Sequence, residues 1–161
     1  MAAVTADQIR LERALESKVM STATVGTANT VYIGTLCAFK PASARVWNAT
    51  PTASWTLAGI VEGVVNDSGT PIAAITGNTA GTIKVRYSWG QEALFTLITA
   101  ARTYTNINKT AIMKTNNEVD GTAVGTALVR MQVGAIVEQE AASLATVWVA
   151  IRRFGTGAAT G

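Results

Sequence analysis

The sequence predicts an all-β protein, a small antiparallel β-barrel or sandwich, preceded by an N-terminal arm that contains a short helix. Two observations support this prediction. About nine or ten short segments rich in β-branched residues are separated by Gly, Asn and Asp turns, without long helical patterns between them. A strand motif also occurs twice, since residues 58–64 (AGIVEGV) are echoed by residues 133–138 (VGAIVE). A jelly roll and other small barrels remain equally compatible with these patterns.

Residues 1–30 differ from the rest of the chain and are predicted to form an arm and a linker. Thr5 to Gln8 has the form of a capping box, and Leu11 and Leu15 are spaced for one face of a helix. A helix this short is marginal alone, so we expect it to dock on its own domain or on a neighbouring molecule. Residues 21–30 are mostly Thr, Ala and Gly, which is typical of a linker.

The β-domain is predicted over residues 31–154. Residues 82–89 alternate between an apolar and a polar face, which indicates a half-buried strand. Glycines inside predicted strands, at positions 34, 59 and 134, indicate bulges or corners. Residues 155–161 are small and are expected to form a flexible tail. The remaining strands are expected at residues 31–39, 45–47, 55–65, 72–76, 93–98, 111–114, 118–119, 133–138 and 145–151, and residues 125–130 are expected to lead into the final strand pair.

The composition indicates one domain of 161 residues with an unusually uncharged surface. Charged residues make up only 14% of the chain, against roughly 25% in ordinary soluble domains. Such a surface is either covered by Thr, Ser, Asn and Gly or partly buried against another molecule. The net charge of +3 is spread along the chain, so no basic stripe for nucleic acid is expected. No apolar run reaches the roughly 20 residues that span a membrane.

The sequence offers no catalytic equipment, and we expect neither an enzyme nor a bound metal or cofactor. The chain has no histidine, which excludes Ser-His-Asp and Cys-His nucleophilic sites and any imidazole ligand. The lone Cys37 lies in an apolar run, as core cysteines do. Glu62 and Glu138 hold matching positions in the two motif copies, but repeated strand ends facing solvent explain them more simply. The four tryptophans either line a ligand groove or anchor the core and subunit contacts, namely Trp47, Trp55, Trp89 and Trp148.

The β-domain resembles the cement, or decoration, proteins of tailed-phage capsids. The resemblance rests on short Gly-punctuated apolar strands that end in a "V-G-x-I-V" strand and an alternating "V-x-V-x-I" strand. The matching segments are residues 31–36 (VYIGTL), 58–64 (AGIVEGV), 81–87 (GTIKVRY), 133–138 (VGAIVE) and 147–151 (VWVAI). The arm and linker depart from the compact family pattern.

The resemblance implies a structural protein on the outer surface of the virion, made in the host cytoplasm. Such proteins commonly form homotrimers and bridge neighbouring copies of the major capsid protein. The arm is the expected contact, with apolar side chains buried against coat protein or a neighbouring copy and arginines at the rim. These residues are Ile9, Arg10, Leu11, Arg13 and Leu15. The alternative is a receptor- or glycan-binding head domain of a virion spike or fibre, which needs exposed aromatic side chains in a groove.

Overall fold

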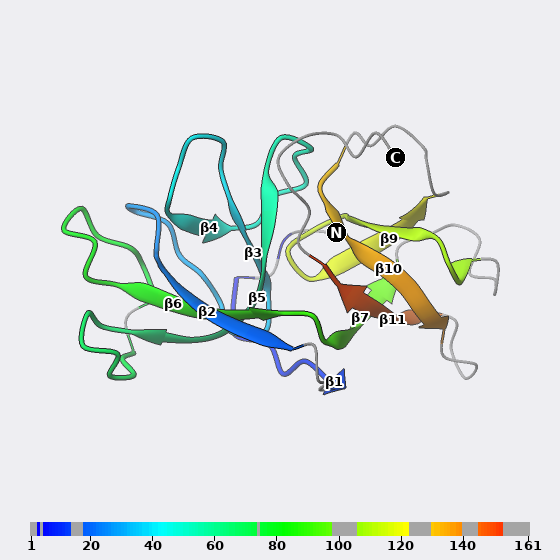
Figure 1. Cartoon of the computed structure of the whole chain (residues 1–161), viewed down its shortest axis with the longest axis horizontal. Helices are drawn as coiled ribbons and strands as arrows, with labels where there is room; N and C mark the ends of the chain where they lie inside the picture. Colours follow the sequence, from blue (N-terminus) through cyan, green and yellow to red (C-terminus); the bar gives the residue numbers. More distant parts are fainter. Residues whose placement is uncertain are drawn as a thin grey trace.

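The computed structural model of the chain describes residues 3, 5–13, 18–73, 75–97, 106–122, 130–139 and 145–152. These residues form eleven strands and contain no α-helix. The prediction of an all-β protein with a small β-barrel is therefore confirmed. The strands gather in two lobes that lie side by side in Figure 1.

The first lobe is a curled antiparallel sheet with the strand order β2-β6-β5-β3-β4. Its two edge strands approach each other, because Val25, directly after β2, forms a parallel bridge with Val46 of β4. The Gly26 amide also donates to the Val46 carbonyl at 2.7 Å. The strands are β2 (Val19–Thr24), β3 (Leu36–Phe39), β4 (Val46–Asn48), β5 (Thr56–Val65) and β6 (Lys84–Trp89).

The second lobe is a closed five-stranded barrel with the order β7-β11-β10-β8-β9. A parallel pairing of β7 with β9 closes it, with Thr96 opposite Glu118. The short β1 (Glu12–Arg13) pairs with the same edge of β7 as β9 does, but at the beginning of β7, where Glu12 lies opposite Ala93. The barrel strands are β7 (Glu92–Leu97), β8 (Thr110–Met113), β9 (Glu118–Thr122), β10 (Gln132–Gln139) and β11 (Thr146–Ile151).

The two lobes are a structural repeat. Strands β2 to β6 and β7 to β11 pair in the same order along the chain, and each lobe closes through a parallel contact between its first and third strands. The registers agree as well. Gly59 lies opposite Cys37 of β3 as Gly134 lies opposite Ala111 of β8. The register of β5 with β6 shifts two residues after Gly59, and the register of β10 with β11 shifts two residues after Gly134. The motif that occurs twice in the sequence is therefore the same strand of each lobe.

Both motif glycines lie where the backbones of paired strands come very close. A Cβ on Gly59 would lie 2.1 Å from the Ser88 carbonyl oxygen, and one on Gly134 would lie 1.9 Å from that of Ala150. Register shifts flank both positions, so the prediction that these glycines mark bulges is confirmed. Only glycine tolerates such an approach without moving a strand.

Two hydrophobic cores stabilise the molecule. Alternate side chains of the first sheet face opposite ways, so Ile60 and Val61 belong to different cores. The common core joins the lobes, because Leu36 and Ile60 pack with second-lobe residues such as Phe95 and Ile136. The inner core belongs to the first lobe alone, and it includes Cys37, Val61, Val85 and Tyr87.

The expected N-terminal helix is wrong over residues 5–13, which form no helix and end in β1. Residues 14–17, including Leu15, lie outside the described residues. Backbone groups of so short a segment find better partners on another strand than within one or two helical turns, because helix nucleation is costly. The expected linker is also wrong in part, since β2 begins at Val19 and pairs along β6. Its β-branched threonines suit a strand.

Other boundaries differ in detail. Residues 31–35 precede β3 without forming a strand, and residues 72–76 contribute an isolated bridge between Thr76 and Thr30. The segment expected to lead into the final strand pair, residues 125–130, and the expected tail at 155–161 lie outside the described residues, apart from Arg130.

Candidate functional site

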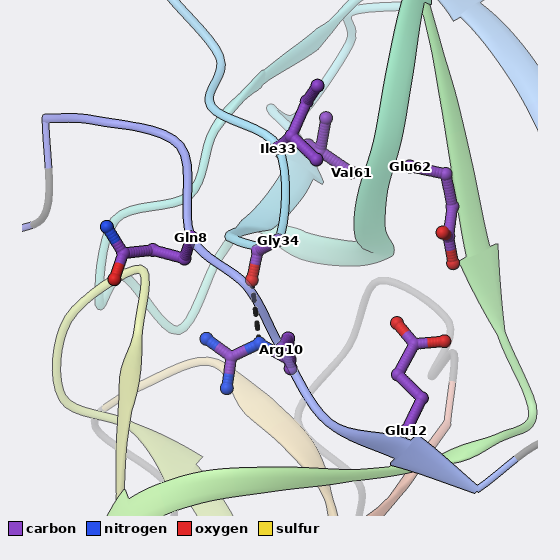
Figure 2. Close-up of a pocket in the computed structure, with 7 residues that line it drawn as sticks. All are labelled: Gln8, Arg10, Glu12, Ile33, Gly34, Val61 and Glu62. Atoms are coloured by element: carbon purple, nitrogen blue, oxygen red, sulfur yellow. Dashed lines mark hydrogen bonds between the residues drawn. The ribbon is translucent and has the colours of Figure 1, made fainter.

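The most distinctive surface is the segment of residues 7–13, which we call the N-terminal strap. It lies across both lobes (Figure 2). The Gln8 amide donates to the Ile33 carbonyl of the first lobe at 2.7 Å, and the Leu94 amide of the second lobe donates to the Leu11 carbonyl at 3.0 Å. The strap then joins the second lobe as β1, with Glu12 opposite Ala93.

Arg10 fastens the strap at the junction of the lobes. Its Nε donates to the Gly34 carbonyl at 2.6 Å, a bond drawn in Figure 2, and one terminal nitrogen donates to the Leu94 carbonyl at 2.6 Å. The other terminal nitrogen donates to the Asn117 side-chain oxygen. The guanidinium carbon also lies 3.9 Å from the centre of the Phe95 ring. One side chain thus bonds β7, the turn before β3 and the turn before β9.

The environment of Arg10 combines burial with the nearby negative charge of Glu12. Burial lowers the pKa of Arg10 to about 10, and the negative charge of Glu12 opposes this change. The side chain therefore stays protonated at neutral pH, and carbonyl and amide oxygens take the place of water around it. Donors in a planar fork suit acceptors in several directions, which a lysine ammonium on its flexible stem does not match.

Arg13 attaches the end of the strap to the second lobe. Its guanidinium stacks on Trp148 at 3.8 Å from the ring centre and forms ion pairs with Glu138 at 2.6 Å and Glu92 at 3.5 Å. The hydrogen bond to Glu138 raises the pKa of Arg13, and the same bond lowers the pKa of the Glu138 carboxyl. These pairs are partly exposed, so each contributes little stability alone.

A cavity of about 340 Å³ opens beside the strap, lined by Gln8, Arg10, Glu12, Ile33, Gly34, Val61 and Glu62. In Figure 2 the carboxylates of Glu12 and Glu62 point toward one another. Lys18 binds both, with its Nζ 2.7 Å from Glu12 and 3.0 Å from Glu62. One ammonium thus bridges the two carboxylates and balances one of their two negative charges.

The apolar side chains of the strap face outward. Ile9 is fully exposed and Leu11 is 60% exposed, above a second cavity of about 250 Å³ beside Leu94 and Phe95. Of the arm residues predicted to meet a partner, Ile9 and Leu11 are available on the surface. Arg10 and Arg13 bond within their own chain, and Leu15 lies outside the described residues. A role of these residues at an interface stays a prediction.

The prediction that Glu62 and Glu138 hold equivalent positions in the repeated motif is wrong by one residue. Glu62 lies in the register shift of β5, so its counterpart in β10 is Val137. Of the two roles considered for the four tryptophans, the structure favours packing within the protein. Trp148 is buried beneath Arg13, Trp89 stacks on Tyr87 at 5.8 Å, and Trp55 packs on the common core. Trp47 and Trp55 flank the ammonium of Lys40, at 3.5 and 5.0 Å.

The described residues contain no group of three or more Cys, Asp or Glu side chains placed to hold a metal ion. Within that same part of the chain, no helix has the length and apolar character needed to cross a membrane.

Sequence reasoning missed Asn117, Leu94 and Phe95 as partners of Arg10. No local pattern marks them, because they come from distant segments that only the tertiary fold brings together.

The fold and the strap define an all-β protein of two tandem lobes with an extended N-terminal segment bound across their junction. No protein-family model matches the chain, and no curated protein is similar to it at a significant level.

Proposed function

We propose that the chain is a structural virion protein that binds the outer surface of an assembled tailed-phage capsid, as a trimer, and clamps neighbouring major coat proteins. The observation that carries this proposal is the exposure of Ile9 and Leu11 on a segment that Arg10 and Arg13 hold firmly to the body. A backbone segment that is already held in place loses little entropy when a partner covers its apolar side chains.

The surface chemistry supports the same proposal. The chain has few charges for its size, as a surface that is partly buried in an assembly requires. Many such contacts, repeated over a shell, act together through avidity even when each is weak. A clamp of this kind needs no cofactor and no turnover.

Two measurements test the proposal on purified particles of the virus that encodes the chain. Quantitative mass spectrometry should find the protein in a ratio of one to a small integer with the major coat protein. A handful of copies would instead favour the spike or fibre head domain, and complete absence from particles would refute both.

The second measurement replaces Ile9 and Leu11 by Asp together. We expect the double variant to fold normally and to lose binding to particles that lack the protein. Ile107→Asp is the matched control, because Ile107 is also exposed but lies outside the strap. Equal binding by the double variant and the control would refute the role of the strap.

A further inference from the structure

The position that the strap occupies on the second lobe has a counterpart on the first lobe. On the second lobe, Glu12 and Arg13 pair with Ala93 and Glu92 of β7. Glu92 lies opposite Ala150 of β11. Ala150 is equivalent to Ser88 of β6, because Ala150 pairs with the residue after Gly134 and Ser88 pairs with the residue after Gly59. Met20 of β2 lies opposite Ser88, so Met20 and Ser21 correspond to Glu92 and Ala93.

This counterpart is open in the part of the chain that the structure describes. Strand β2 pairs with β6 on one side, and its other side is the edge of the sheet. The contact with β4 begins only after β2 ends, at Val25. Val19 and Met20 are 44% and 48% exposed. The Leu94 amide, which donates to the strap, corresponds to the amide of Thr22, and no described strand lies on that side of Thr22.

The edge also lacks the usual protection. The sequence VMSTAT of β2 contains no charge and no proline, and its register with β6 is continuous over all six residues, without a bulge. Natural proteins commonly protect exposed edges with lysine, proline or bulges, because an open edge pairs with other strands. The Lys18 ammonium directly before β2 is bound by Glu12 and Glu62 instead.

The two positions differ in charge. Arg13 of the strap meets Trp148, Glu138 and Glu92, and the equivalent residues of the first lobe are Arg86, Gly63 and Met20. Arg86 is exposed, and its side chain forms no hydrogen bond or ion pair with the described residues. An arginine in the place of Arg13 would meet a like charge there, whereas a carboxylate would be attracted.

We propose that the outer edge of β2 binds an extended acidic segment of a partner protein, added as an antiparallel strand with a carboxylate beside Arg86. Backbone hydrogen bonds supply affinity in such strand addition, and side chains supply specificity. A second copy of the chain is a poorer occupant, because every copy carries the same Arg86 and a net charge of +3. This inference does not depend on whether the partner is a coat protein.

The test uses the full chain and two synthetic peptides of residues 5–15, one with the natural sequence and one with Arg13→Glu. Hydrogen exchange of the protein is followed with each peptide at millimolar concentration. The R13E peptide should slow amide exchange in residues 19–24 by about threefold or more, and the natural peptide should do so less.

Two protein variants sharpen the result. Arg86→Glu should reverse the preference between the two peptides, whereas Arg152→Glu, an equal charge change at an exposed arginine of the second lobe, should leave it unchanged. The inference is overturned by unchanged exchange in residues 19–24 with both peptides, or by equal protection from both that Arg86→Glu does not alter. Concentration-dependent protection of residues 19–24 without peptide would also overturn it, in favour of a second copy.

Discussion

Arg10 shows how one side chain can decide the conformation of a whole segment. Its guanidinium bonds two backbone carbonyls and an amide oxygen on three separated parts of the chain and lies over the Phe95 ring. Without it, the Gly34 and Leu94 carbonyls would lose a charged donor in a partly buried place. The strap would then depend on the few backbone bonds to Ile33 and β7.

Arg10→Ala should lower the free energy of unfolding by about 2–4 kcal/mol, because several hydrogen bonds to a charged group are lost together. Arg10→Lys should recover only part of this loss, since one ammonium does not reach three separated acceptors. Chemical denaturation measures both changes. Arg152→Ala is the control, and a loss no larger for Arg10→Ala than for this exposed arginine would contradict the role given to Arg10.

At the scale of the element, the repeated strand is built around a glycine and the register shifts that flank it. In β5 and β10 the glycine lets the partner strand approach, and the shift two residues later changes the twist of the pair. The same device in both lobes produces the same curl, which allows the first and third strands of each lobe to meet. The glycines thus explain why the motif is repeated.

Gly59→Ala and Gly134→Ala should each lower the melting temperature strongly, because the new methyl group would contact a backbone oxygen that cannot move alone. We expect a loss of about 2–3 kcal/mol or more for each, in the range of overpacked sites. Gly63→Ala, in the same strand as Gly59, has no atom within 4 Å of the added methyl and should be nearly neutral. Equal melting temperatures for all three variants would show that the close approach is not important.

At the scale of the whole molecule, the lobes repeat each other but do not have independent cores. Leu36, Leu57 and Ile60 of the first lobe belong to the same buried cluster as Phe95, Val133 and Ile136 of the second. The Leu36 amide also donates to the Asn116 carbonyl across the junction at 2.8 Å. We therefore expect the lobes to unfold together.

Ile60→Ala tests this expectation, because it removes a buried side chain from the common core at a cost of about 2–5 kcal/mol. Native-state hydrogen exchange should show an equal loss of protection in β6 and in β11. Ile107→Ala, at an exposed position, is the control. Unchanged protection in β11 would mean that the lobes are separate folding units.

Much of the fold could be predicted from local patterns. The alternation of residues 82–89 gave the correct strand, and the repeated glycine motif marked equivalent strands in two lobes. The candidate site was predicted less well. Ile9 and Leu11 are exposed as an interface requires, but the partners of Arg10 and Arg13 were not predictable, since they come from β7, β10, β11 and the turns before β3 and β9.

The sequence by itself therefore determined the all-β class, the lack of histidine-based chemistry and the repeat, because these depend on composition and on short-range periodicity. Only the tertiary structure decided that residues 5–13 form no helix, that β2 is a strand with an open edge and that Arg10 lies at the junction of the lobes. These features depend on which distant backbone groups and side chains satisfy one another, and that choice is made by burial and long-range hydrogen bonding.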